Sequence, residues 1–172
     1  MISEKLEKAL NVQINAEYYS SYLYLSMSSY FDAKGLPGMS NWMRMQAQEE
    51  MIHAMKIYDY VLERSGRVLL VEIEAPQTEW DSALEVFEES YAHEQKVTGM
   101  INELVSLSLA EKDYAAESFL QWFVDEQVEE EASVTAVLDQ LRLVGDNGMG
   151  LFMIDGQLAQ RQAPAAPAAD GA

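Results

Sequence analysis

Residues 41–60 read NWMRMQAQEEMIHAMKIYDY, a helix-forming stretch whose buried face is unusual. In a bundle helix, side chains that step by four and three residues lie on one face and form a stripe toward the core. Here that stripe is apolar at both ends and carries Gln46, Glu50 and His53 in its middle. The pattern predicts a long helix that places a carboxylate and an imidazole inside a helical bundle.

Turn-forming residues divide the chain into four long helical segments and a short fifth one. Residues 35–38, Gly-Leu-Pro-Gly, separate the first segment from the second, and Gly66 is predicted to cap the second at its C-terminal end. Ser82 and Glu85 have the spacing of a capping box, which starts the third segment. Asp113 is predicted as the N-cap of the fourth.

The lengths of these segments predict how they pack. Each main helix would span about 27–32 residues, or roughly 40–48 Å at 1.5 Å per residue, so the helices must lie side by side. Short linkers make neighbouring helices antiparallel, whereas residues 67–81 contain Pro76 and are long enough to run the length of the bundle. We therefore expect an all-α four-helix bundle with a long crossover between helices two and three, which would be parallel.

One domain is expected, because 172 residues that are 49% hydrophobic suffice for a sizeable core. The bundle would cover residues 1–161 and include a short C-terminal fifth helix over about residues 147–159. The remaining tail, residues 162–172, is rich in Ala and Pro and is predicted to be disordered.

Composition excludes several classes of function. The sequence has no cysteine, which rules out disulfides, thiolate metal sites and thiol catalysis. Its net charge of -18 argues against nucleic acid as a partner, because phosphate contacts need a basic patch. No apolar run approaches the roughly 18 residues that cross a membrane, and the charged N-terminal stretch does not look like a signal peptide. We expect a cytoplasmic protein without a membrane partner.

The four predicted stripes all carry acid near their middle, at Glu17, Glu50, Glu94 and Glu130. A buried carboxylate costs several kcal/mol even after relaxation, and four at one level also repel one another. They must therefore be protonated or neutralised by cations. Two divalent metal ions would balance four carboxylates, and His53 projects from the same helix face as Glu50. In the third helix the predicted stripe consists of Phe87, Tyr91, Glu94, Thr98, Ile101 and Val105.

The spacing of these residues is regular. Glu17 and Glu50 are 33 residues apart, and so are Glu94 and Gln127. Glu17 and Glu94 are 77 residues apart, and so are Glu50 and Gln127. Because a solvated charge face has no reason to keep such a register, the spacing predicts two halves related by a pseudo-two-fold axis.

At this point the sequence resembles the non-haem ferritins of bacteria and archaea. The matching segments are NAEYYSSYLYLSMSSYF, NWMRMQAQEEMIHAMKIYDY, EWDSALEVFEESYAHE and FLQWFVDEQVEEEAS. The resemblance implies a ferritin-like bundle and a ferroxidase, which oxidises Fe(II) with dioxygen or peroxide and stores ferric oxide mineral inside a cage. The cage would be a homo-oligomer, usually of 24 subunits in that family and built from dimers.

The same resemblance assigns residues of this chain to a pair of iron ions. Glu50 would bridge the two ions, with Glu17 and His53 on the first ion and Glu94 and Glu130 on the second. Carboxylates with one imidazole are donors that suit iron or manganese. The residues of this set are Glu17, Glu50, His53, Glu94, Gln127 and Glu130.

Further residues would surround the pair. Gln127 would lie close to the second iron, at a position where a second Glu-x-x-His motif would place a glutamate. Glu49, Glu126 and Glu129 would form a nearby third iron site in which Glu130 is shared.

Two further side chains lie near the predicted site. Tyr24 follows Glu17 by two turns on the same stripe. In the family, such a tyrosine hydrogen-bonds near the site and can supply an electron. His93 neighbours Glu94 but falls off the stripe, so it is predicted to be a surface histidine.

Two alternatives to a non-haem ferritin stay open. A bacterioferritin-like protein would bind haem through Met51, which directly follows the bridging glutamate and faces outward. Its second Glu-x-x-His motif is replaced here by Gln127 and Glu130, so we expect no haem in the native protein. The other alternative is a non-catalytic acidic bundle in which hydrogen bonds satisfy the buried acids.

Overall fold

The computed structural model describes residues 2–163, and this part of the chain forms five helices and no strand. The predicted tail lies outside the described residues from residue 164 onward. The five helices are α1 (Glu4–Ala33), α2 (Pro37–Glu63), α3 (Ala83–Ala110), α4 (Tyr114–Val144) and α5 (Gly148–Leu158).

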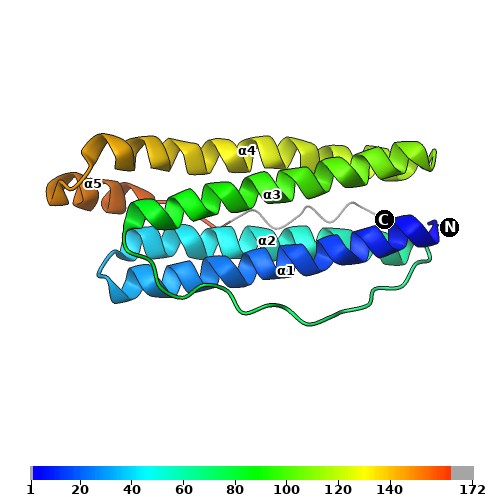
Figure 1. The fold of residues 1–172 in the computed structure, drawn as a ribbon, viewed down its shortest axis with the longest axis horizontal. Coiled ribbons are helices and arrows are strands. Elements are labelled where there is room, and N and C mark those ends of the chain that lie inside the picture. The colour runs from blue at the N-terminus through cyan, green and yellow to red at the C-terminus, as the bar shows by residue number, and fades with distance from the viewer. Residues whose placement is uncertain (1, 164–172) are drawn as a thin grey trace.

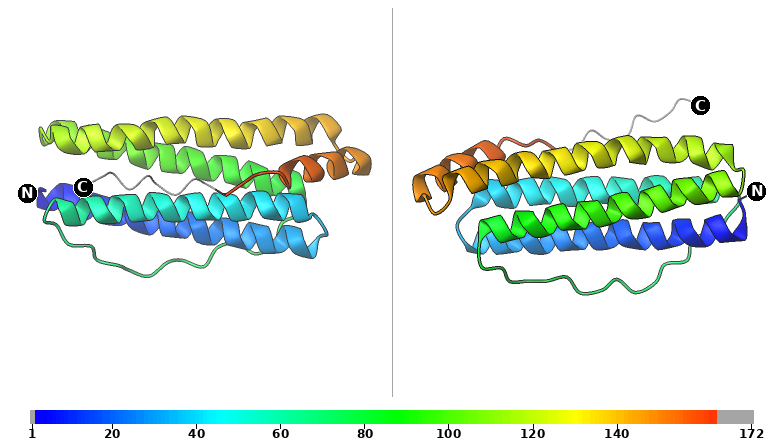
Figure 2. Two further views of the ribbon diagram at one scale, coloured as in Figure 1. Left: turned by 180° about the vertical axis from the view of Figure 1, so that it is seen from behind. Right: turned by 45° about the horizontal axis from the view of Figure 1, so that its top comes forward.

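Helices α1 to α4 lie side by side, and α5 packs across one end of the bundle (Figures 1 and 2). The pairs α1–α2 and α3–α4 are in close contact, and α1 also contacts α3. Residues 64–82 run along the outside from one end to the other, so that α2 and α3 point in the same direction (Figure 1). The predicted all-α bundle with a long crossover is therefore confirmed.

Side-chain caps start the helices at the predicted places. Ser82 accepts a hydrogen bond from the backbone N–H of Glu85 at 3.1 Å, and Asp113 accepts one from Ala116 at 3.1 Å. Asp113 also pairs with the guanidinium of Arg64, with an Nη2–Oδ2 distance of 2.8 Å. This ion pair ties the end of α2 to the start of α4.

The predicted glycine cap of α2 differs in its details. Ser65 is the residue in the left-handed conformation, with φ of 60°, whereas Gly66 is not. The N–H of Gly66 still donates to the carbonyl of Val61 at 2.9 Å and so satisfies the last turn.

The buried stripes agree with the predicted ones in α1 and α2 throughout, but not in α3. In α3 the predicted residues Tyr91, Thr98 and Val105 are only half-buried. Phe87, Glu94 and Ile101 are buried as predicted, but at the other three levels the helix is rotated slightly, so that residues one position earlier face the core. The fully buried residues at these levels are Ser90, Val97 and Leu104.

Apolar residues gather in two separate clusters along the bundle. In α1, for example, Leu6 and Leu10 belong to one cluster, and Met27 and Phe31 belong to the other. Glu17 falls between the two sets in sequence, and the acids of the other helices occupy the corresponding positions. The polar level is therefore enclosed by hydrophobic core at both ends, which keeps it away from bulk water.

A close backbone contact fixes α5 on the start of α2. The carboxylate of Asp155 accepts a hydrogen bond from the N–H of Met39 at 2.8 Å and caps α2, because Leu36 supplies no side-chain cap. A Cβ atom at Gly38 would lie 1.7 Å from the carbonyl oxygen of Asp155. Only glycine lets the two backbones approach this closely.

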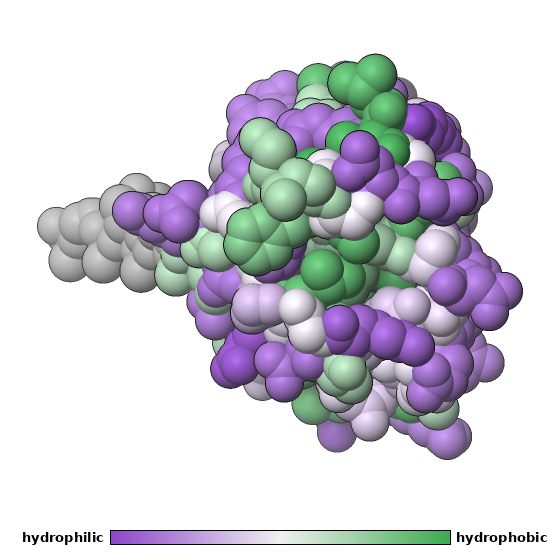
Figure 3. All heavy atoms as spheres, turned by 90° about the vertical axis from the view of Figure 1, so that its left-hand side faces the viewer, coloured by the Kyte–Doolittle hydropathy of each residue, from purple (hydrophilic) through white to green (hydrophobic). Residues whose placement is uncertain are grey.

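The outer side of α5 is apolar and exposed. Met149, Phe152 and Met153 expose 69%, 71% and 69% of their surface. Figure 3 shows apolar side chains gathered on this end of the molecule. An exposed patch of this kind marks an association surface more often than a free one.

None of the described helices is long and apolar enough to span a lipid bilayer.

Replacing Gly38 by alanine should destabilise the protein by about 1–3 kcal/mol, because the backbone of α5 must move away from α2. Gly99→Ala, on the exposed face of α3, is the matched control, because an added Cβ meets nothing within 4 Å. It should stabilise the protein by about 0.5–1 kcal/mol. Urea unfolding followed by circular dichroism measures both changes. Equal effects of the two substitutions would contradict the proposed backbone contact.

Candidate metal centre

Each long helix contributes one buried carboxylate to the same level of the bundle. Glu17 comes from α1, Glu50 from α2, Glu94 from α3 and Glu130 from α4. Their exposed fractions are 1%, 2%, 1% and 5%. Helical periodicity places them there, because each lies on a stripe whose other members pack into the apolar clusters.

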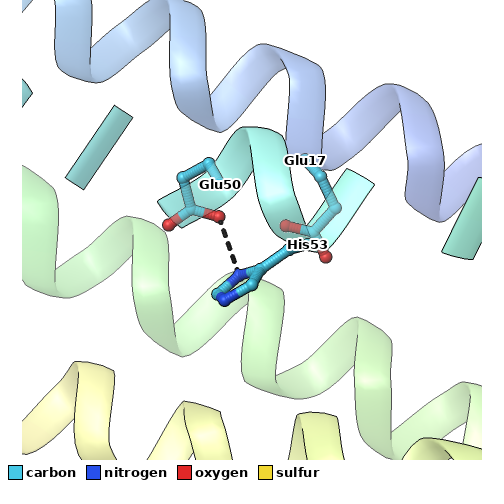
Figure 4. Close-up of side chains that lie close together, drawn as sticks. All are labelled: Glu17, Glu50 and His53. Carbon is cyan, nitrogen blue, oxygen red and sulfur yellow. Dashed lines mark ion pairs between the residues drawn. The ribbon is translucent and has the colours of Figure 1, made fainter. Parts of the chain in front are cut away.

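A first group of possible metal ligands joins α1 and α2. Ligand atoms of Glu17, Glu50 and His53 all lie within 4.8 Å of one another (Figure 4). His53 Nδ1 is 3.4 Å from Glu50 Oε2, the contact dashed in Figure 4. The rings of Trp122 and Phe123 meet the imidazole edge-on, with centroids 5.4 and 6.1 Å away, and hold its orientation.

The other nitrogen of the same imidazole faces α4. Ligand atoms of His53, Glu126 and Glu130 lie within 4.8 Å of one another, and His53 Nε2 is 3.9 Å from Glu126 Oε2. The sequence assigned Glu126 to a third site and His53 to the first ion. The structure places the two side chains next to each other, so that His53 links both groups.

Glu94 is turned toward neutral donors. The Tyr24 hydroxyl donates to Glu94 Oε1, and the Gln127 amide donates to Glu94 Oε2 at 3.2 Å. Gln127 Nε2 also lies 3.3 Å from the hydroxyl of Thr98, so its amide faces α3. Gln127 is thus beside Glu94, where the sequence placed it.

Two glutamines that sequence reasoning left without a role hold the acids in place. Gln46 Nε2 donates to the carboxylate of Glu130 and lies 3.5 Å from Glu50 Oε1. Gln13 Nε2 donates to Glu17 Oε1 at 2.7 Å. Their stripe positions, one turn before an acid, were the available signal.

The residues predicted for a third iron are not drawn together as a group. Glu126 is half-buried beside His53, whereas Glu129 is exposed and belongs to neither group of ligand atoms. Glu49 is half-buried and forms an ion pair with Arg161. The third site therefore stays a prediction.

His93 is not the surface residue that the sequence predicted. Its Nε2 lies 2.7 Å from the Ser20 hydroxyl, and its ring packs on Tyr19 with centroids 5.8 Å apart. Burial lowers the pKa of His93 to about 4, so the ring is neutral at physiological pH. The rotation of α3 accounts for the difference, because it turns this side chain toward α1.

Burial makes the carboxylates hold protons. It raises the pKa of Glu17 to about 8, with the charge of Glu50 adding to the effect. Burial also raises the pKa of Glu130 to about 7 and that of Glu94 to about 6. The pKa of Glu50 lies well above its usual value, first through burial and then through the charges of Glu94 and Glu130.

One atom of this set has no hydrogen-bond partner. Glu17 Oε2 is fully buried, and no donor reaches it from the described residues. Buried polar atoms are normally paired, so this oxygen fits a coordination position for a cation. Two divalent ions would replace the protons and neutralise the acids, which the carboxylate and imidazole donor set suits.

Comparison with protein families gives a match to the ferritin-like domain over residues 7–144. Among curated relatives, a bacterial non-heme ferritin of Bacteroides fragilis is 48% identical over 161 residues, which cover 94% of this chain and 100% of the relative. A probable bacterial non-heme ferritin-like protein of Haemophilus influenzae is 46% identical over 158 residues, which cover 92% of this chain and 96% of the relative.

A similar solved structure is an open-pore ferritin of the archaeon Archaeoglobus fulgidus. It is 57% identical, with a TM-score of 0.93, and the match covers 94% of this chain and 100% of that one. A form of that ferritin engineered to be closed has a TM-score of 0.94 and 56% identity over 95% of this chain and 100% of that one.

Without metal, the protein should lose thermal stability as the pH rises from 6.5 to 8. In this window the folded state keeps protons on Glu17 and Glu130 that the unfolded chain, with carboxyl pKa near 4.5, has already released. Each pKa unit corresponds to about 1.4 kcal/mol, so the loss amounts to a few kcal/mol. Calorimetry in a chelator measures it. His93, whose pKa is lowered to about 4 in the folded state, adds only a small opposite change below about pH 7, where the unfolded imidazole is still partly protonated.

Glu17→Gln keeps an oxygen that accepts the hydrogen bond from Gln13 but removes one titrating carboxyl group. The melting temperature of this variant should therefore vary less with pH. Zn²⁺ should reverse the trend in the unsubstituted protein, because binding releases the protons and tightens as the pH rises. A melting temperature that is flat or rises with pH in the chelator would contradict the assigned protonation.

Proposed function

Because this chain belongs to the ferritin-like domain family, we propose that it is a non-haem ferritin subunit that takes up Fe(II), oxidises it and stores the ferric product. The observation that carries the proposal is the set of four buried carboxylates at one level, in which Glu17 Oε2 has no hydrogen-bond partner among residues 2–163. A bundle built only for stability would not keep these acids in its core, since apolar residues of similar volume would be less costly.

In this proposal, iron is the substrate and the acids form its oxidation site. Glu17, Glu50 and His53 would bind one Fe(II), and Glu50 with Glu94 and Glu130 would bind the other. Each Fe(II) gives up one electron. The pair thus supplies the two electrons that, with two protons from water, reduce dioxygen to hydrogen peroxide. The carboxylates stabilise the more highly charged Fe(III), which then moves on to the mineral.

Protons move in a direction that favours uptake. Glu17 and Glu50 are protonated before iron arrives, so binding of Fe(II) displaces their protons. His53 needs no proton to act as a ligand through Nδ1, and its Nε2 faces Glu126 across the bundle. Gln46 and Gln13 supply neutral donors that orient Glu130 and Glu17 without competing for the cation.

The third iron position belongs to the same proposal. Glu49, Glu126 and Glu129, with Glu130 shared, would hold an ion at the edge of the buried pair. The half-buried positions of Glu49 and Glu126, between the core and the exposed Glu129, support a transfer position for iron.

Assembly into a closed homo-oligomer, a 24-mer cage built from dimers, completes the proposal. The exposed apolar side chains of α5 support it, because they would be covered by neighbouring subunits. Excess negative charge on the chain would concentrate Fe(II) near the cage.

Replacing Glu17 and Glu130 together by alanine should abolish stoichiometric Fe(II) binding at the buried site and slow the fast phase of oxidation at least tenfold, because each ion loses a ligand. An anaerobic Fe(II) titration, followed by air and by ferric absorbance, measures both. The matched control is Glu103→Ala with Glu111→Ala, two exposed acids on α3 and just after it.

An unchanged fast phase of oxidation in the Glu17→Ala, Glu130→Ala variant would contradict the assignment of the site. No binding of Fe(II) by the unsubstituted protein would instead support a non-catalytic acidic bundle. Gel filtration of the same sample should give a shell-sized species. A Soret band in the purified protein would move the assignment to a haem-binding store, with exposed Met51 as the ligand to test.

Tyr24→Phe should slow Fe(II) oxidation while leaving the stoichiometry of Zn²⁺ binding unchanged. The hydroxyl donates to Glu94 and is fully buried, and burial keeps the pKa of Tyr24 well above 10, so the phenol stays protonated. Stopped-flow absorbance and calorimetry separate the two effects. Tyr22→Phe, on the exposed side of α1, is the control, and an equal effect of both substitutions would remove the role of Tyr24.

A further inference from the structure

The described chain that follows α5, residues 159–163, continues in the direction of α5 and lies on α2. Asn41 Nδ2 donates to the carbonyl of Arg161 at 3.0 Å and lies 3.4 Å from that of Ala159. Figure 2 (left) shows this segment on the side of the bundle that α2 shares with α4. The segment therefore covers the edge of the candidate metal centre, and it is anchored there through its backbone.

Its cationic side chain, Arg161, reaches Glu49 at the edge of the buried acids. The guanidinium of Arg161 stacks over the Trp42 ring, 4.4 Å from the centroid, and its Nη2 pairs with the Glu49 carboxylate. Its Nη1 donates to Gln46 Oε1 at 2.7 Å. The Arg161 side chain is only 19% exposed and that of Glu49 only 23%, so the ion pair is sheltered from water.

Through Gln46 the same guanidinium acts on the buried pair. An amide has one acceptor oxygen and two donor hydrogens. Because Arg161 occupies the oxygen, the NH₂ group must point inward, where it meets Glu130 and Glu50. Arg161 therefore determines the orientation of a side chain that contacts two of the four acids.

We infer that Arg161 is a tethered cation that fills the cation position at Glu49 until a divalent metal ion displaces it, and that it positions Gln46 meanwhile. This inference rests on the proposed function, since it concerns the order in which metal fills the carboxylates. The guanidinium occupies one oxygen of the Glu49 carboxylate, and its positive charge repels a second cation at the same group. A metal ion that binds Glu49 therefore competes with Arg161, whereas one at Glu17, Glu50 and His53 need not.

Because Arg161 is part of the same chain, it competes with a metal ion for Glu49 without having to diffuse there. A group held beside Glu49 by its own backbone competes at a high effective concentration that dilution does not change. The outer position should consequently bind metal more weakly than the inner pair. Iron would occupy Glu49 only when the inner positions are full. Iron would therefore leave the inner pair through Glu49 only after the pair has been filled.

The test is a calorimetric titration of the assembled protein with Zn²⁺, which binds without redox chemistry. Wild type should show tight steps that Glu17→Ala removes and a weaker step that Glu49→Gln removes. Arg161→Gln should strengthen the weaker step about five- to tenfold and leave the tight steps unchanged. Arg161→Lys keeps the positive charge but loses the planar guanidinium with its paired N–H donors. The affinity of its weaker step should lie between those of wild type and Arg161→Gln.

Arg142→Gln is the matched control, because Arg142 pairs with Glu88 at 3.2 Å on the exposed surface of α3 and α4, away from the acids. A second readout is the fluorescence of Trp42. Filling the weaker step should change the emission in wild type, since the guanidinium leaves the ring, and should not do so in Arg161→Gln or Trp42→Phe.

Three outcomes would overturn the inference. The first is an Arg161→Gln titration identical to that of Arg142→Gln. The second is a weaker step that Arg161→Gln abolishes, which would make Arg161 a structural support of Glu49. The third is the absence of any Glu49-dependent step in both wild type and Arg161→Gln, while the Glu17-dependent steps persist. Loss of the dependence on Glu17 would contradict the proposed function instead.

Discussion

The burial of four carboxylates between two apolar clusters is the constraint on which the rest of this structure depends. Ionised and unpaired, these groups would oppose folding, and burial raises the pKa of each of them. Gln13, Gln46 and Gln127 donate hydrogen bonds to them, and one oxygen of Glu17 has no hydrogen-bond partner among the described residues. The apolar clusters above and below exclude water and make the penalty larger. The core therefore suits cations, which would balance the charge of these acids.

In the proposed centre, the two metal positions would be alike in backbone register and different in chemistry. Equal sequence spacings place Glu17 opposite Glu94, and Glu50 opposite Gln127. The side chains depart from this symmetry, because His53 contacts acids on both sides, whereas the Gln127 amide donates to Glu94 and Thr98 on α3. The position at Glu17 would thus have an imidazole and a carboxylate oxygen that no donor among the described residues reaches, and the position at Glu94 would have a carboxylate already bound by Tyr24 and Gln127. The proposal therefore implies unequal affinities.

Most of the fold, and the burial of the site residues, could be predicted from the sequence because both depend on local periodicity. Every stripe residue predicted for α1 and α2 is buried, and the caps at Ser82 and Asp113 lie where the spacing placed them. The errors arise where distant segments decide the outcome. The rotation of α3 turns the half-buried His93 toward α1, and the path of the chain after α5 brings Arg161 to Glu49. Neither contact leaves a periodic signal along the chain.

Gly38 and Asp155 have a meaning for protein engineering that goes beyond helix packing. They attach α5 to α2, and Arg161 follows only a few residues after that attachment. The end face with Met149 and Phe152 and the cation beside Glu49 are therefore carried by one short piece of chain, which Asp155 and the Asn41 side chain attach to α2. A substitution on the end face that alters subunit contacts can therefore also move Arg161 relative to Glu49. The two properties can be changed independently only if the contact of Gly38 with Asp155 is kept.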